Sequence, residues 1–399
     1  MTKYITIESM TKTKTADIAA TVSQINHLAS IGCDIIRVAV PDIESAGAIT
    51  KIKENIMIPL VADIHFDHKL ALLAIEAGAD KIRINPGTIG MRENVKAIAK
   101  ACNQKNIPIR IGANSGNLEK EMLEKHGGVT PEALVESTMN HVKILNQCDF
   151  DNIWLAAKSS HVKLTVDTYK LLHQQTNYPL HIGVTEAGTE YNGIIKSSIG
   201  IGTLLLDGIG DSIRVSLTAP PEKEIDAAKA ILKALNLRPG IDIISCPTCG
   251  RCNIDIIKIT NEVEKRINAE LDKTPPPPNS QPLTPSSSSH LPTSNSQLPS
   301  LRHCERTKQS NPPPHHRPLH TQNHQPQITI AIMGCAVNGP GEASQADYGI
   351  AGGDGKGAIF AKGKIIKTAP MENLTEELFN MITNHVGVAP LRDPLTSKE

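Results

Sequence analysis

Eight short runs rich in β-branched residues recur along the first 240 residues, and each is followed by a stretch with helical spacing of its apolar residues. The runs cover residues 4–8, 33–38, 58–63, 80–85, 107–112, 152–157, 180–184 and 211–216, with helical patterns such as 15–31, 69–77 and 131–146 between them. Strands alternating with helices indicate parallel βα units. Eight units in about 220 residues are typical of a TIM-type (β/α)8 barrel. We therefore predict such a barrel over residues 1–239, and the chain lacks the Gly-rich fingerprint of a dinucleotide-binding sheet after its first run.

Composition excludes several partners. The 41 basic and 41 acidic side chains cancel, which argues against a general nucleic-acid or anionic-membrane surface. The N-terminal sequence MTKYITIESMTKTK has no apolar stretch of a signal peptide, and no apolar run approaches the roughly 18 residues of a membrane span. We expect a soluble, cytoplasmic protein without nucleic-acid or membrane partners.

Polar side chains mark the ends of the predicted strands. They are Arg37; Asp63 and His65; Arg83 and Asn85; Arg110 and Asn114; Lys158 and Ser160; His181 and Glu186; Arg214 and Ser216. In a barrel all these ends open on one face, where active sites form. One cation at such a position is commonly a solvated loop charge, but five at equivalent positions imply a polyanionic ligand, and the planar Arg fork suits phosphate. The pattern predicts that the barrel mouth binds a phosphorylated small molecule.

Residues 275–326 differ from the rest of the chain. They hold 13 of the 27 prolines and six of the 15 histidines, with almost no apolar periodicity. We predict a disordered insert, because this composition offers too little apolar surface to offset chain entropy.

The segments that flank the insert, 240–273 and 327–399, are predicted to form one small α/β domain. The patterns indicate strands at Ile241–Ser245 and Ile328–Met333, helices over 255–271 and 376–385, and tight turns in the Gly-rich stretch 349–357.

Cysteines gather in this second region. The motif CPTCGRC supplies Cys246, Cys249 and Cys252, and GCAVNGPGE supplies Cys335 and Glu342. A C-x2-C pair is compatible with zinc, a redox dithiol or an iron–sulfur cluster. No second C-x2-C pair follows, as a zinc ribbon would require, and Cys335 does not precede a proline as in ferredoxins. Spacing alone favours iron–sulfur and leaves zinc and the dithiol open.

The motifs CPTCGR and GCAVNGPGE resemble those of the 4-hydroxy-3-methylbut-2-enyl diphosphate synthase family. The barrel half is similar to the same family in SMTKTKTAD, RVAVPD, PLVADIHFD, KIRINPGTIG, IRIGANSGNLE, PLHIGVTEAG and GIGDSIRVSL. The resemblance covers nearly the whole chain outside 275–326. It departs from the family at Glu8, where Gln is usual, and at Lys12 and Thr88, where Asn is usual.

The resemblance implies an oxidoreductase that opens the ring of 2-C-methyl-D-erythritol 2,4-cyclodiphosphate and dehydrates it, in the methylerythritol phosphate route to isoprenoids. It implies a [4Fe–4S] cluster bound by Cys246, Cys249, Cys335 and Glu342, with Cys252 not a ligand. Flavodoxin or ferredoxin would donate electrons. The family forms homodimers in which the small domain of one chain caps the barrel of its partner.

On this basis the barrel-mouth residues receive roles. The expected substrate-binding residues are Arg37, His65, Arg83, Asn85, Arg110, Asn114, Lys158, Ser160, Arg214 and Ser216. Glu186 is the candidate proton donor to the leaving hydroxyl, and Asn338 is expected to orient substrate or cluster. Two rival hypotheses are a zinc-containing barrel enzyme acting on a phosphorylated substrate and a degenerate paralogue that binds its ligand without turnover.

Overall fold

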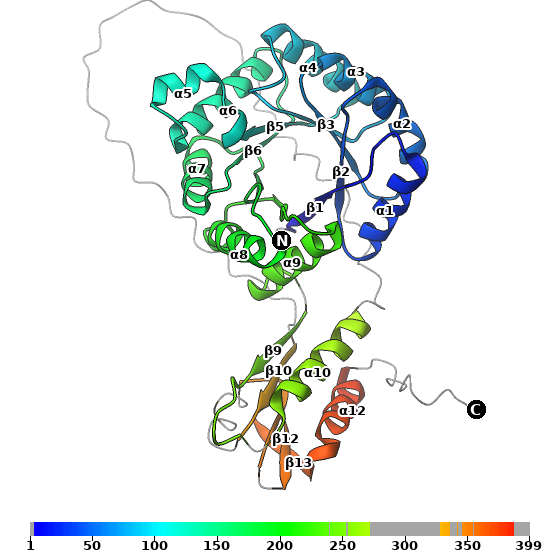
Figure 1. Ribbon diagram of the computed structural model, residues 1–399, viewed down its shortest axis with the longest axis vertical. Helices are drawn as coiled ribbons and strands as arrows, with labels where there is room; N and C mark the ends of the chain where they lie inside the picture. The colour runs from blue at the N-terminus through cyan, green and yellow to red at the C-terminus, as the bar shows by residue number, and fades with distance from the viewer. Residues whose placement is uncertain are drawn as a thin grey trace, which may run out of the picture.

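The protein is represented by a computed structural model that describes residues 4–238, 240–252, 254–271, 328–335, 341, 345–353 and 355–386. Figure 1 shows a ring of helices around an inner set of strands, and a smaller sheet with helices packed on it that follows along the chain. Asn338, Glu342 and the segment 275–326 lie outside the described residues. Among the described residues, none of the helices combines the length and the apolar character that crossing a membrane would require.

Eight parallel strands form the first sheet. They are β1 (Thr6–Met10), β2 (Ile35–Ala39), β3 (Leu60–Ile64), β4 (Lys81–Ile84), β5 (Ile109–Asn114), β6 (Ile153–Lys158), β7 (His181–Ile182) and β8 (Ser212–Ile213). Their order is β6-β5-β4-β3-β2-β1-β8-β7, and a parallel bridge between Leu155 and Leu180 joins the two ends. The predicted TIM-type barrel is therefore confirmed.

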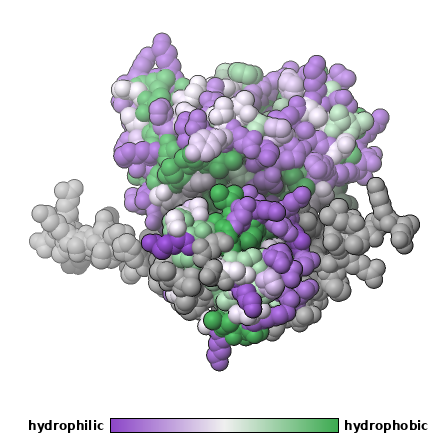
Figure 2. Space-filling view, turned by 60° about the horizontal axis from the view of Figure 1, so that its bottom comes forward, coloured by the Kyte–Doolittle hydropathy of each residue, from purple (hydrophilic) through white to green (hydrophobic). Residues whose placement is uncertain are grey.

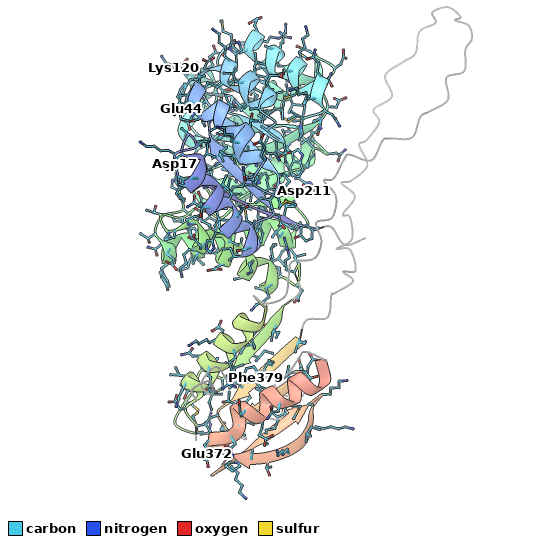
Figure 3. The ribbon with its side chains drawn as sticks, turned by 90° about the vertical axis from the view of Figure 1, so that its right-hand side faces the viewer. Asp17, Glu44, Lys120, Asp211, Glu372 and Phe379 are labelled. Carbon is cyan, nitrogen blue, oxygen red and sulfur yellow. The ribbon has the colours of Figure 1, made fainter. Side chains whose placement is uncertain are left out.

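Helices cover the outside of this barrel. They are α1 (Ile18–Ser30), α2 (Ile43–Lys53), α3 (His68–Glu76), α4 (Arg92–Lys105), α5 (Lys120–His126), α6 (Pro131–Asn146), α7 (Val162–Gln175), α8 (Glu190–Leu206) and α9 (Pro221–Ala234), with a 3-10 turn at Ser115–Asn117. Asp17, labelled in Figure 3, begins α1 by accepting a hydrogen bond from the backbone N–H of Ala20. Asp42, Asp67 and Thr130 cap their helices in the same way.

Successive side chains along each strand point alternately to the core beneath the helices and to the interior of the barrel. On β4, Ile82 and Ile84 are fully buried in the aliphatic core beneath the helices, whereas Arg83 faces the barrel interior. Register places Asp63, Arg83 and Arg110 side by side on β3, β4 and β5. TIM barrels usually fill this space with branched aliphatic residues, so a charged interior marks a binding site.

The second sheet has the order β13-β12-β11-β10-β9. Its elements are β9 (Ile241–Ser245), α10 (Ile256–Leu271), β10 (Ile328–Met333), β11 (Tyr348–Ala351), β12 (Lys356–Ala361), β13 (Lys364–Pro370), a 3-10 turn (Met371–Asn373) and α12 (Leu374–Val386). Because β9 and β10 are parallel neighbours, the segments on either side of 272–327 contribute to one sheet. Phe379 of α12, labelled in Figure 3, packs in the core of this domain.

One feature of the Gly-rich stretch differs from expectation. Gly349 does not form a turn but lies within β11. A glycine is needed at this position because a Cβ there would approach Cε2 of Phe360 to 2.3 Å. This glycine permits close packing of an aromatic ring from the adjacent strand. A turn does follow between β11 and β12, where Gly355 adopts a φ of +69°.

Candidate functional site: the barrel mouth

A cavity of about 150 Å³ opens at the carboxyl ends of the barrel strands. It is lined by Arg37, Asp63, His65, Arg83, Arg110, Gly112, Asn114, Ala156, Lys158, His181, Thr185 and Arg214. Seven of the ten predicted substrate-binding residues therefore meet at one place. The lining holds five Lys or Arg side chains and one carboxylate, so an anion is the ligand that its charge favours.

Asp63 organises one wall of the cavity. Nη1 of Arg83 donates to Oδ1 of Asp63 at 2.8 Å and approaches Nε2 of His65 at 2.7 Å, while Nη2 donates to the carbonyl of Gly112 at 2.9 Å. Burial raises the pKa of Asp63, but Arg83, Arg37 and His65 outweigh it and hold that pKa below its ordinary value. The carboxylate thus stays ionised and fixes the Arg83 fork.

The tautomer of His65 follows from its neighbours. Its Nε2 faces the donor Arg83, so Nε2 accepts and Nδ1 carries the proton, which it donates to Oγ1 of Thr88 at 3.0 Å. Burial, together with the nearby Arg side chains, lowers the pKa of His65 and favours this neutral form. Thr88, one of the departures from the resembled family, therefore supplies the acceptor that orients His65.

Arg37 lies on β2 beside the same carboxylate. Its Nε is 3.9 Å from Oδ2 of Asp63, and its Nε and Nη2 contact Sδ of Met10 at 3.3 and 3.1 Å. A thioether is a weak acceptor, so this guanidinium remains available to a stronger one.

Arg110 forms the floor of the cavity with Glu8. Nη1 and Nη2 of Arg110 contact the two carboxylate oxygens at 2.5 and 2.8 Å, and both side chains are only 1% exposed. Burial raises the pKa of Glu8, but the Arg110 charge and hydrogen bonds reverse this and lower it to about 2. Both terminal nitrogens of Arg110 are thus occupied by a residue of the protein itself.

Lys158 of β6 and His181 of β7 also line the cavity. Burial lowers the pKa of Lys158 well below its ordinary value, and Arg110 and Arg214 lower it further. Burial, followed by Lys158 and Arg110, likewise lowers the pKa of His181, whose Nδ1 contacts Oγ of Ser212 at 2.8 Å. Its Nε2 is buried without a hydrogen-bond partner in the described part of the chain. Glu8 is the nearby carboxylate, with Oε1 at 3.6 Å from Nε2 of His181, but it is bonded to Arg110, so an anionic ligand would supply further counter-charge.

Arg214 follows β8, and within the described part of the chain it forms an ion pair with one carboxylate, that of Glu224. Its Nη2 is 3.8 Å from Oε2 of Glu224, and its Nε is buried without a hydrogen-bond partner there. Burial, with Arg37 next, lowers the pKa of Arg214 to about 10. Glu224 and Thr185 were not predicted from the sequence. Glu224 stands in the first turn of a helix, where acidic residues are common, and no spacing signal distinguishes it.

Three of the predicted substrate-binding residues, and the candidate proton donor Glu186, do not line the cavity. Asn85 is buried, accepts from the N–H of Gly87 at 3.0 Å and leaves Nδ2 without a partner among the described residues. Ser160 and Ser216 are half-buried in the loops that follow β6 and β8. Glu186 is exposed in the loop after β7 and has a φ of +50°. A non-glycine residue in this left-handed region is uncommon and frequently marks a functional site.

The cysteines lie at one end of the smaller sheet. Cys246 follows β9 directly, its N–H donates to Ile332 of β10 at 3.0 Å, and Cys335 follows β10 two residues beyond its end. Cys246 and Cys335 therefore lie at the carboxyl ends of neighbouring parallel strands, with the exposed Cys249 in the loop between β9 and α10. The described residues contain no group of three or more His, Cys, Asp or Glu side chains close enough to hold a metal ion. The donor set itself, three thiols on adjacent loops, suits a soft metal centre.

Cys252 has a different environment. Its Sγ donates to the carbonyl of Ile254 at 3.2 Å and lies 2.4 Å from where a Cβ on Gly334 would be. The side chain is packed beneath the loop that carries Cys335. These contacts give Cys252 a packing role, and its exclusion from the cluster ligands stays a prediction.

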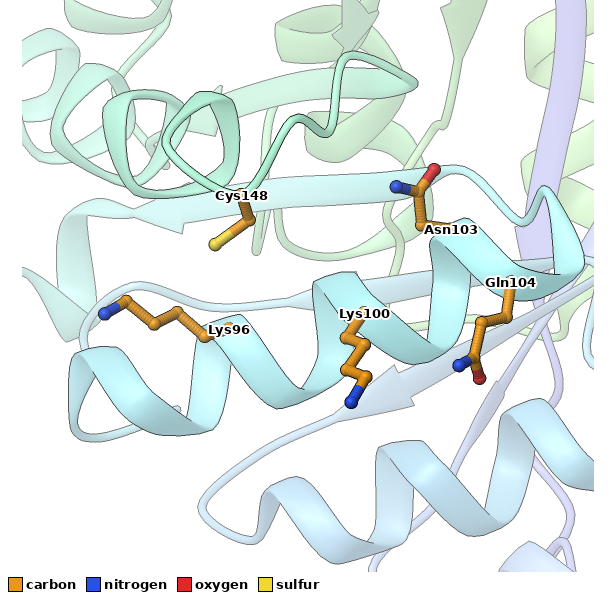
Figure 4. Close-up of a pocket in the computed structure, with 5 residues that line it drawn as sticks. All are labelled: Lys96, Lys100, Asn103, Gln104 and Cys148. Atoms are coloured by element: carbon orange, nitrogen blue, oxygen red, sulfur yellow. The ribbon is translucent and has the colours of Figure 1, made fainter.

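A second hollow lies on the outer helical layer (Figure 4). Lys96, Lys100, Asn103 and Gln104 of α4 line it together with Cys148, which follows α6. Figure 4 shows these side chains spread along the helix and not converging on one point. The barrel mouth is therefore the stronger candidate site.

A (β/α)8 barrel with a cation-lined mouth, followed by a small domain with cysteines at its strand ends, defines a barrel protein that binds an anionic small molecule. The GcpE TIM-barrel domain family matches residues 2–229, and the GcpE C-terminal domain family matches residues 304–384. The chain belongs to the GcpE family.

Curated relatives agree along almost the whole chain. The 4-hydroxy-3-methylbut-2-en-1-yl diphosphate synthase (flavodoxin) of Caldicellulosiruptor saccharolyticus is 53% identical over 379 residues, 95% of this chain and 93% of the relative. The enzyme of the same name from Clostridium perfringens is 50% identical over 379 residues, with the same coverage. Among solved structures, Yersinia pestis dihydropteroate synthase has a TM-score of 0.38 and 12% identity, over 58% of this chain and 93% of that one, too distant to support an argument.

Proposed function

We propose that this chain catalyses the reductive ring opening and dehydration of 2-C-methyl-D-erythritol 2,4-cyclodiphosphate to 4-hydroxy-3-methylbut-2-enyl diphosphate. The observation that carries the proposal is the barrel mouth, where five cationic side chains surround one carboxylate in a chain 53% identical to a synthase of this name. A diphosphate matches the charge of this cavity. Because the relatives' name specifies flavodoxin, we propose flavodoxin as the electron donor.

The barrel residues would bind and orient the substrate. Arg37, Arg83, Lys158 and Arg214 contribute positive charge toward the cavity, and each bond to a phosphate oxygen would be charge-assisted. Arg110 stands apart from them because a single carboxylate, that of Glu8, accepts from both of its terminal nitrogens, whereas those of Arg83 donate to Asp63 and to the carbonyl of Gly112. We assign Arg110 to the floor of the site, where its charge is neutralised by Glu8 and the pair supports the surrounding side chains.

The small domain would supply the electrons. Cys246, Cys249 and Cys335, with Glu342, are the residues that would hold a [4Fe–4S] cluster, and thiolates are the ordinary ligands of such clusters. When bound, the cluster would deliver the two electrons of the reaction, which protein side chains cannot donate. Asn338, between two of these ligands in sequence, would orient substrate or cluster.

Glu186 is the candidate proton donor to the hydroxyl that leaves as water. It is exposed in the loop after β7, next to the cavity-lining Thr185, and its backbone is held at a φ of +50°. Strained backbone of this kind persists where the surrounding fold fixes it, which would direct the carboxyl group at one point.

We also propose a homodimer in which the small domain of one copy closes over the barrel of the other. The supporting feature is an exposed apolar face on α8, formed by Tyr191, Ile195, Ile199 and Leu206. Figure 2 shows apolar side chains gathered on the lower part of the barrel domain, where α8 lies in Figure 1. Monomeric proteins seldom expose a continuous apolar stripe along a helix, so a second copy is a reasonable partner for it.

An anaerobic assay tests the proposal. The reconstituted protein is mixed with the cyclic diphosphate and a dithionite-reduced viologen dye, and oxidation of the dye is followed. We expect substrate-dependent oxidation, abolished by Cys335→Ser and at least half retained by the matched variant Cys252→Ser. Absence of oxidation in a protein that binds substrate would favour the degenerate paralogue, and equal loss in both variants would refute the ligand assignment. One zinc and no acid-labile sulfide in the purified protein would refute the cluster.

A further inference from the structure

Glu224 is a buried charge next to the barrel mouth but is not among the residues that line it. Its side chain is 1% exposed in the first turn of α9. Oε1 accepts from Nζ of Lys12 at 3.0 Å and from the N–H of Leu217 at 3.1 Å, and Oε2 accepts from Oγ of Ser9 at 3.2 Å. Nη2 of Arg214 lies 3.8 Å from Oε2. The carboxylate therefore has four neighbours that donate hydrogen bonds or carry positive charge.

These neighbours come from the carboxyl ends of two barrel strands and the loops that follow them. Ser9 lies in β1 and Lys12 follows it, whereas Arg214 and Leu217 follow β8. Strands β1 and β8 are adjacent, and they are the first and last strands of the barrel along the chain. Glu224 thus links the carboxyl ends of β1 and β8, where the first and last strands along the chain pair with each other.

Arg214 needs such support. It lines the cavity, and its Nε is buried without a hydrogen-bond partner in the described residues. A buried donor without an acceptor is costly, so its orientation must be fixed by the groups around it until a ligand arrives. Within the described residues, the carboxylate that forms an ion pair with Arg214 is that of Glu224. The pair involves Nη2 of Arg214, so Nε remains available to another acceptor.

We propose that Glu224 is a positioning residue, which clamps the loops after β1 and β8 and thereby holds the Arg214 guanidinium so that Nε meets a phosphate oxygen of the ligand. The inference rests on the proposed function for the identity of that ligand. It assigns Glu224 no contact with substrate, because the residue is absent from the cavity lining.

Calorimetric binding of inorganic pyrophosphate tests the inference without requiring turnover. Glu224→Gln keeps the shape of the side chain but removes its charge. We expect its Kd for pyrophosphate to rise about tenfold, the equivalent of one charge-assisted hydrogen bond. In the turnover assay, KM for the cyclic diphosphate should rise by a similar factor while kcat stays within about twofold.

A double-mutant cycle separates positioning from general stability. If Glu224 acts through Arg214, then Glu224→Gln should change the Kd by less than about twofold in an Arg214→Gln background. Asp34→Asn is the control, because Asp34 is a partly buried carboxylate, 16% exposed, that also has three donors, Tyr4, Ile7 and Arg238, at the other end of β2. It should lower the melting temperature and leave the Kd unchanged.

The pyrophosphate Kd of the single and double variants decides whether Glu224 is a positioning residue. An unchanged Kd in Glu224→Gln, or additive effects in the double mutant, would show that Glu224 is only structural. If Glu224→Gln does not fold, Ser9→Ala removes a single donor to the carboxylate and should raise the Kd two- to threefold, and no change would overturn the proposal. A wild-type protein that binds pyrophosphate but does not turn over would refute the proposed function, and the binding cycle would still decide the role of Glu224.

Discussion

Removing the charge of Glu8, which forms a buried ion pair, should destabilise the barrel far more than removing the carboxylate charge of an ion pair with the same contact distance at the surface. Glu8 and Arg110 are each 1% exposed, and two short contacts of 2.5 and 2.8 Å join them. The fall of the Glu8 pKa from 4.5 to about 2 corresponds to roughly 3 kcal/mol in favour of the folded state. The loss of one partner of a buried ion pair costs about 3–5 kcal/mol, which agrees in size.

The assay is thermal unfolding followed by circular dichroism. Glu8→Gln should lower the Tm by about 10 °C, since 1 kcal/mol shifts a domain of this size by about 2–4 °C. Glu136→Gln is the matched control, because Lys125 contacts Glu136 at the same 2.5 Å distance but the two side chains are 58% and 30% exposed. A solvent-screened pair at the surface contributes little to stability, so the control should shift the Tm by less than about 4 °C.

The pH dependence gives a second check on Glu8. A carboxyl group whose pKa is lowered on folding stabilises the protein above its ordinary pKa of 4.5, and this stabilisation is lost as the pH falls toward about 2. More than half of the difference between wild type and Glu8→Gln should therefore disappear at about pH 3. Equal Tm shifts for Glu8→Gln and Glu136→Gln, or a difference that does not change with pH, would refute the reasoning.

Three further predictions concern the cavity. Burial lowers the pKa of Lys158, and a bound phosphate would favour its charged form, so pyrophosphate affinity measured by calorimetry should fall as the pH rises. Lys158→Arg should flatten this pH dependence, and the same slope of affinity against pH in both proteins would contradict the prediction. Gly112→Ala would place a Cβ 2.5 Å from Nε of Arg83 and should raise KM at least tenfold, whereas Gly116→Ala, with no atom within 4 Å, should not. Glu186→Gln should lower kcat by about 10²- to 10⁴-fold with little change in KM, and a rise in KM alone would indicate a binding role.

The barrel could be predicted because its signal repeats eight times. Seven of the eight strands begin and end within two residues of their predicted runs, for example Leu60–Ile64 against 58–63, and β8 ends three residues before its run does. Several predicted runs begin too early because apolar residues such as Ile5 and Ile58 are buried in the loops that precede the strands. An apolar pattern alone does not distinguish such loop residues from strand residues. The prediction for α6, Pro131–Asn146, matches at both ends, because Thr130 caps the helix and a proline occupies its first position.

The location of the site was predictable, but the pairing within it was not. Strand-end position identifies Arg37, Arg83 and Arg110 as neighbours, since parallel strands all end at one face. Which of them is free to bind a ligand depends on side chains far away in sequence. Glu8 neutralises Arg110 across 102 residues, and this contact exists only because the barrel closes.

Charged residues on helices were harder still to interpret. Glu224 reads as an ordinary acidic residue in the first turn of α9, and its burial depends on how α9 packs against β1. The unusual residues Lys12 and Glu8 gained an explanation only from the structure, because each forms an ion pair beside the mouth.

The most direct test of the proposed function follows the phosphorus atoms of the substrate. The anaerobically reconstituted protein is incubated with 2-C-methyl-D-erythritol 2,4-cyclodiphosphate and reduced flavodoxin, and the mixture is examined by phosphorus NMR. We predict that the signals of the cyclic diphosphate are replaced by those of a linear diphosphate monoester, and that Arg83→Gln prevents the change. Persistence of the cyclic signals with a fully loaded wild-type protein would contradict the assignment of this chain as a reductive ring-opening enzyme.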